Sequence, residues 1–148
     1  MILARGPRPW AIRLFAVTFA VAGLLAFVDG MRDIPGQASY LQQRAPEFAI
    51  DSDTVIVLLS IRLTIALIPI GLVWFGAARF ARWLVALFAI AKLVNVPAAL
   101  ELIRRDEAIS PWWAASVALS LAGAALLFTP SAGRWFAGKG ARAADVFD

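Results

Sequence analysis

The sequence contains no cysteine and no histidine. Without cysteine it has no disulfide framework, no thiol nucleophile and no CxxC redox pair. Without histidine it lacks the commonest metal ligand and the commonest general base near neutral pH. These absences exclude haem ligation through histidine and Ser-His-Asp catalysis. We therefore expect a protein that is not an enzyme, with no cofactor and no metal site.

Charged residues are also scarce. They make up 16% of the 148 residues, whereas 61% are hydrophobic, and the mean hydropathy is +0.78. This composition is far more apolar than that of a soluble domain of the same size. The net charge of +4 would fit nucleic acid, but the basic residues gather beside apolar segments. We expect a lipid bilayer as the partner and no nucleic acid.

Four long apolar runs predict an all-α polytopic membrane protein. They cover residues 10–28, 54–75, 83–103 and 112–129, and a helix needs about 20 residues to cross the hydrocarbon core. Residues 1–130 would form one four-helix transmembrane bundle, followed by a flexible tail at 131–148. All six tryptophans fall at or beside the predicted span ends, as in an interfacial aromatic belt.

Local signals support the span boundaries. Asp51, Ser52 and Asp53 supply N-cap chemistry before the second span, and Ser110 with Pro111 does so before the fourth. The first run could instead be a cleaved signal peptide, but its apolar character continues past the candidate cleavage site near residue 22. An uncleaved first span is the favoured interpretation.

The flanking charges predict that both termini are cytoplasmic, in a bacterial inner membrane. The N-terminus, the turn between spans two and three, and the tail carry seven basic residues: Arg5, Arg8, Arg79, Arg82, Arg134, Lys139 and Arg142. The other two loops carry four, and basic residues favour the cytoplasmic side. The outer loop, residues 29–53, would then be an ordinary connector, within which residues 37–45 could form a short surface helix.

Arg62 and Lys92 lie deep inside the second and third spans. At 1.5 Å per residue, Arg62 is about 12 Å and Lys92 about 16 Å from the outer end of its span. The two cations are thus at similar depth. Asn95 lies one turn outward of Lys92, and Glu101 lies on the opposite face of the same span. We take Arg62, Lys92 and Asn95 as the candidate ligand- or partner-binding residues.

Three interpretations of these cations remain open. In the first, Arg62 extends outward to water, and Lys92 bonds Asn95 and backbone carbonyls or is uncharged. In the second, both cations line a water-filled cavity and attract an anionic solute or lipid head group. In the third, they pair with carboxylates of another subunit. Pro69 and Pro97 could kink their helices and free carbonyls near these side chains.

Stripes of small residues run along spans one and four. Ala16, Ala20 and Gly23 mark the first, and Ser116, Ser120 and Ala124 mark the fourth. Small residues let membrane helices approach closely, so the two spans are expected to pack together within one chain, or else to form a dimer.

The sequence resembles no four-span family. For example, small multidrug transporters carry a glutamate inside their first span, where this chain has only Arg13. The leading hypothesis is therefore a non-catalytic membrane protein that acts through association, as an accessory subunit or a small oligomer. The alternative is a small transporter or channel with Arg62 and Lys92 as its anion site. The acids of the outer loops are expected to be an ordinary loop surface.

Overall fold

The computed structural model describes residues 8–76, 79–104 and 109–144, and every regular element in these ranges is an α-helix. The helices are α1 (Trp10–Arg32), α2 (Ile34–Arg44), α3 (Ser52–Gly76), α4 (Ala81–Leu93), α5 (Val96–Arg104), α6 (Pro111–Leu126) and α7 (Pro130–Ala144). The all-helical prediction is confirmed for this part of the chain.

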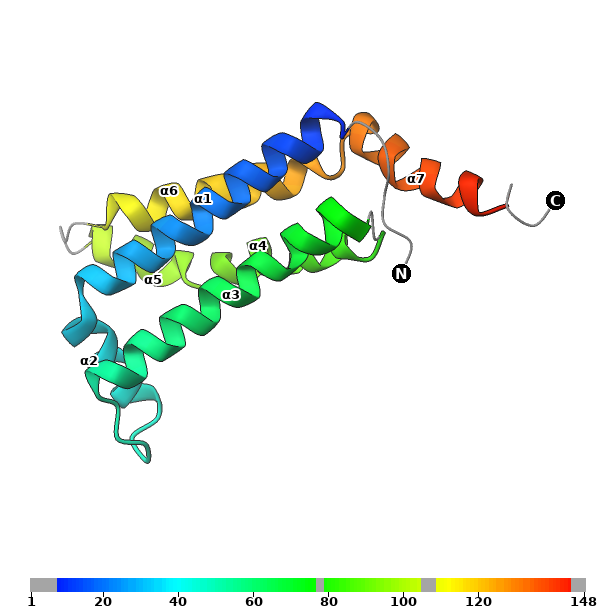
Figure 1. Ribbon diagram of the computed structural model, residues 1–148. Coiled ribbons are helices and arrows are strands. Elements are labelled where there is room, and N and C mark those ends of the chain that lie inside the picture. The colour runs from blue at the N-terminus through cyan, green and yellow to red at the C-terminus, as the bar shows by residue number, and fades with distance from the viewer. Residues whose placement is uncertain (1–7, 77–78, 105–108, 145–148) are drawn as a thin grey trace.

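The long helices lie roughly along one direction, so the bundle has two distinct ends (Figure 1). At one end α1 and α4 begin while α3 and α6 stop. We call it the arginine end, because it carries Arg8, Arg79, Arg82 and Arg134. At the other end, the α2 end, α1 leads into α2 and α3 begins. From the arginine end, α7 turns away from the bundle.

Side-chain caps explain where three helices begin. Asp33 accepts a hydrogen bond from the backbone N–H of Gly36 at the start of α2 (3.0 Å), and Asp51 accepts one from Thr54 at the start of α3 (2.8 Å). Ser110 accepts one from Trp113 and is followed by Pro111 at the first position of α6. These caps satisfy N–H groups that have no partner within the helix. The predicted caps of the second and fourth spans are confirmed, and α2 provides the short helix expected in the outer loop.

Among the described helices, α1 and α6 share the most extensive interface. Gly123 explains how closely they approach, because an added Cβ there would lie only 2.9 Å from Thr18 Oγ1 and 3.5 Å from a ring carbon of Phe19. The prediction that the first and fourth segments pack together within one chain is confirmed.

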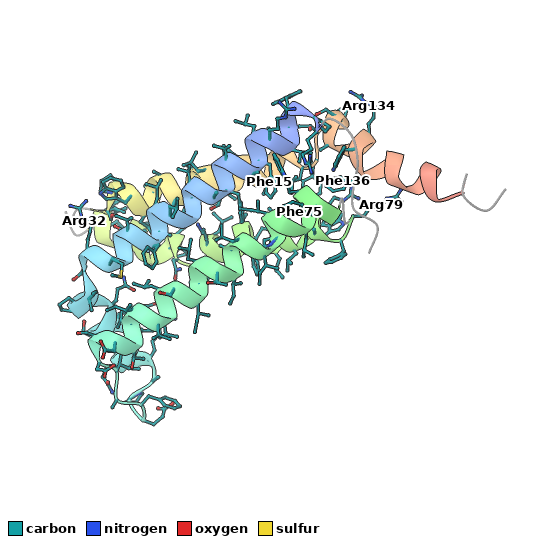
Figure 2. The ribbon with its side chains drawn as sticks, in the orientation of Figure 1. Phe15, Arg32, Phe75, Arg79, Arg134 and Phe136 are labelled. Atoms are coloured by element: carbon teal, nitrogen blue, oxygen red, sulfur yellow. The ribbon has the colours of Figure 1, made fainter. Side chains whose placement is uncertain are left out.

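The apolar core fills the half of the bundle nearer the arginine end. Phe15 and Phe19 of α1, Val85 of α4 and Leu127 after α6 are buried there, together with Phe136 of α7. Figure 2 shows Phe15 and Phe136 close together at this end.

Among the described residues, two helices, α1 and α3, are long and apolar enough to cross a membrane. Helix α6 with the first part of α7 would count as a third crossing if this pair, bent by 57°, forms one span. The predicted third span, residues 83–103, is not one helix. It breaks at Val94–Asn95 into α4 and α5, close to Pro97, which has no N–H to donate to the preceding turn.

The segment after α6 also differs from the prediction. Helix α6 ends at Leu126 rather than at the predicted Thr129, and Pro130 begins α7, a helix that runs through the segment predicted as a tail. Proline suits the first turn of a helix because its missing N–H would be unpaired there in any case. Phe136, within the predicted tail, is only 2% exposed and packs into the core. Of the predicted tail, residues 145–148 lie outside the described residues.

Candidate functional site

A cavity of about 440 Å³ occupies the half of the bundle nearer the α2 end. Its walls come from the second half of α1, the first half of α3, the end of α4 and the first half of α6. On α1 the lining combines the small residues Gly23 and Ala26 with the aromatic rings of Phe19 and Phe27. The polar lining residues are Asp29, Gln37, Arg62, Lys92, Asn95, Ser116 and Ser120.

Two serines of α6 hold the amine of Lys92. Lys92 Nζ lies 2.8 Å from Ser116 Oγ and 2.8 Å from Ser120 Oγ. The serines are four residues apart, which places both hydroxyls on one face of the helix. Both are 1% exposed, whereas Lys92 is half-buried. The lysine therefore links α4 to α6 at the wall of the cavity.

The two hydroxyls are oriented by the backbone. Ser116 donates to the carbonyl of Ala22 on α1 (2.8 Å), and Ser120 donates to the carbonyl of Ser116 (2.7 Å). Each hydroxyl has a single proton, so their lone pairs are what remain for Lys92. An ammonium has three N–H donors, and two of them are used by the serines. The third has no acceptor among the described residues.

Arg62 lines the same cavity from α3. Its side chain is exposed, and within the described ranges it makes no hydrogen bond or ion pair. The structure thus brings Arg62 and Lys92 to one space, consistent with their similar predicted depth. Neither cation is paired with a carboxylate in the part of the chain that the structure describes.

Asn95 lines the cavity as well, but its position differs from the one inferred for a continuous span. It lies at the break between α4 and α5, where its backbone N–H donates to the carbonyl of Lys92 (3.3 Å). Its side chain is exposed. The partners of the Lys92 amine are the two serines of α6, whereas the sequence had pointed to Asn95.

Asp29 lines the cavity at the α2 end. Ser110, the N-cap of α6, donates a hydrogen bond to Asp29 at the end of α1. Arg32 stacks over the ring of Trp112 at the same end, 5.5 Å from its centroid. Gln37 brings α2 to the lining. Glu101, set aside as a partner for Lys92, instead pairs with Arg104 at 3.6 Å.

The serine pair was missed as a site by the sequence prediction, which treated Ser116 and Ser120 only as small packing residues. The available signal was their chemistry: two hydroxyls on one face of an apolar helix. A lysine in another span needs such acceptors. Comparisons with protein-family models, with curated proteins and with solved structures found no match to this chain.

Proposed function

We propose that this chain is an integral membrane protein that binds an anionic group, a phosphate or a carboxylate, in the cavity between α1, α3, α4 and α6. The group would belong to a small solute or to a lipid head group, and the role would be non-catalytic, as in a small transporter or channel. The observation that carries this proposal is that Lys92 and Arg62 line one cavity and that no carboxylate of the described residues is bonded to either.

The donors available to such an anion support the proposal. Lys92 keeps one N–H beyond those it gives to Ser116 and Ser120, and Arg62 keeps its whole guanidinium. Hydrogen bonds between ionised groups are shorter and stronger than neutral ones. A cation at membrane depth is costly unless it meets a partner or water. An anion in the cavity would supply that partner to both side chains.

The membrane arrangement belongs to the same proposal. We infer four crossings in a bacterial inner membrane, with α4 and α5 together forming the third as a broken span and α6 forming the fourth. Helix α7 would then lie at the membrane surface. The arginine end would face the cytoplasm, as the excess of basic residues favours.

A flux assay in proteoliposomes tests the anion site. Inorganic phosphate, acetate and chloride are offered to the wild type and to Lys92→Ala, Arg62→Ala and the control Arg104→Ala, which alters an exposed pair on α5. Loss of one charged hydrogen bond should lower saturable flux about tenfold or more. Arg104→Ala should match the wild type. The absence of flux for every anion, or flux indifferent to both cavity variants, would contradict a transport role.

Association with another subunit is the second candidate, and the exposure of Arg62 favours it. Arg62 lies in the middle of α3, and its neighbours Ile61 and Ile65 are also exposed. A carboxylate on a neighbouring subunit could pair with it there. Blue-native electrophoresis of the wild type and of Arg62→Ala distinguishes this candidate. A larger species that disappears in the variant would support association, and a monomer in both would count against it.

A further inference from the structure

The arginine end carries basic side chains from four separate segments. Arg8 precedes α1, Arg79 lies between α3 and α4, Arg82 is in the first turn of α4, and Arg134 is in the second turn of α7. Figure 2 shows Arg79, Arg134 and Phe136 gathered at this end. Every acidic residue in the described ranges lies toward the α2 end: Asp29, Asp33, Glu47, Asp51, Asp53 and Glu101.

The guanidiniums of two of these arginines are held in place by the protein. Arg8 Nε donates to the carbonyl of Trp74 (3.4 Å), and its Cζ lies 4.8 Å from the centre of the Trp74 ring. Arg79 Nε donates to the carbonyl of Phe136 on α7 (3.3 Å). In both residues the terminal Nη groups make no hydrogen bond to the described part of the chain. Each arginine is therefore oriented by Nε, with its outer donors unused.

Two further donors at this end also lack acceptors. Arg82 Nε and the indole N–H of Trp135 are buried without a partner among the described residues. The Cζ of Arg82 lies 5.5 Å from the Trp83 ring and 5.7 Å from the Phe128 ring, a stacked position of the kind arginine adopts on aromatic faces. Several N–H donors at this end thus lack an acceptor among the described residues, and tryptophan rings of the kind found at membrane interfaces lie beside Arg8 and Arg82.

We propose that the arginine end binds the phosphate of an anionic phospholipid, as a site separate from the cavity. A guanidinium presents two parallel N–H groups that match a phosphate, and Arg8 and Arg79 are already fixed to do so. A net negative head group fits a surface without a described carboxylate. Helix α7, bent 57° from α6, places Arg134 on the side where such head groups would lie.

Native mass spectrometry of the detergent-purified protein tests this proposal with phosphatidylglycerol and phosphatidylcholine as matched probes. The wild type should retain phosphatidylglycerol in preference. Each arginine contributes a factor of about five to affinity for an anionic lipid surface, so Arg8→Gln/Arg79→Gln should bind about 25-fold more weakly. Arg44→Gln, which alters an arginine stacked on Tyr40 at the α2 end, is the control and should behave as the wild type.

The conservative variant separates the guanidinium from mere charge. Arg79→Lys keeps the positive charge but loses the paired N–H groups of the guanidinium. The variant should therefore prefer phosphatidylglycerol less than the wild type does. If the double variant Arg8→Gln/Arg79→Gln does not fold, the lipid preference of Arg79→Lys still tests the proposal. Equal retention of the two lipids by the wild type, or an equal loss in Arg44→Gln, would overturn the proposal, as would full retention in Arg79→Lys. None of these outcomes depends on the cavity.

Discussion

At the scale of single residues, the fixed orientation of Ser116 and Ser120 makes Lys92 a structural link as well as a candidate ligand. Both hydroxyls give their protons to carbonyls and their lone pairs to the amine. Removing them leaves a half-buried amine without its acceptors.

We predict that Ser116→Ala/Ser120→Ala lowers the free energy of unfolding by about 1–3 kcal/mol, the cost of leaving a buried polar group unsatisfied. Unfolding by sodium dodecyl sulfate in mixed micelles measures it. Adding Lys92→Met should recover part of the lost free energy of unfolding, because this change removes the amine that the two serine substitutions leave without acceptors. Ser60→Ala is the control: the Ser60 hydroxyl is exposed and bonds only its own helix, so the change should stay within about 0.5 kcal/mol. No recovery by Lys92→Met would contradict the link.

The cap of α3 gives a pH-dependent prediction outside the apolar segments. Hydrogen bonds from the Thr54 hydroxyl and backbone N–H lower the pKa of the Asp51 carboxyl below its ordinary value. A lowered pKa means that this cap stabilises the folded state above the ordinary pKa and is lost as pH falls through the folded pKa. Carboxyl carbon NMR should show that Thr54→Val moves the Asp51 pKa back toward the ordinary value. An unchanged pKa in Thr54→Val would contradict this assignment.

Sequence reasoning singled out the two cations that line the cavity but not the acceptors of Lys92. Arg62 and Lys92 were identifiable because a charge inside an apolar run is costly wherever the helix goes. Their common cavity depended on helix depth, which the 1.5 Å rise per residue determines. The role of Ser116 and Ser120 depended on which face of α6 meets α4. That is a property of the packed bundle, which the pattern of one helix does not contain.

At the scale of helices, the close contact of α1 with α6 is the feature most sensitive to side-chain size. We predict that Gly123→Ala destabilises the fold by about 1–3 kcal/mol, because its Cβ would crowd Thr18, whose hydroxyl already bonds the carbonyls of Leu14 and Phe15. Gly71→Ala is the matched change in α3, where nothing lies within 4 Å of an added Cβ. It should be neutral or stabilising by up to about 1 kcal/mol. Equal effects in the two variants would contradict the assigned interface.

The helix boundaries show which features a hydropathy pattern predicts and which it does not. The starts of α1 and α3 were predicted within two residues, since apolar runs and caps coincide there. The two prolines had different effects: α3 continues through the buried Pro69, whereas the exposed Pro97 follows a break. Hydropathy counts apolar side chains and does not register a missing N–H. Likewise, the Gly- and Ala-rich composition of the tail did not predict that α7 packs onto the core. It does so through Ala132 and Phe136, which are four residues apart.

At the scale of the whole molecule, the absence of cysteine allows the proposed orientation to be tested with single introduced thiols. We predict that Gln43→Cys on α2 reacts with a membrane-impermeant maleimide in intact cells. Ala137→Cys on α7 should react only after permeabilisation, because the arginine end is expected in the cytoplasm. Both positions are exposed, so burial does not limit the reaction. The reverse pattern, or equal labelling of both positions in intact cells, would contradict the orientation.

The central claim is that an anion enters the cavity and meets Lys92. The chain has only two lysines, Lys92 and Lys139, so ¹⁵Nζ-lysine labelling gives two amine signals, and Lys139→Arg assigns them. The protein is held in zwitterionic nanodiscs and titrated with inorganic phosphate, acetate and dodecyl phosphate. The account predicts that at least one of these anions shifts the Lys92 signal saturably while Lys139 stays in place, and that Arg62→Ala weakens the response. A Lys92 signal that none of the three anions moves would contradict the account.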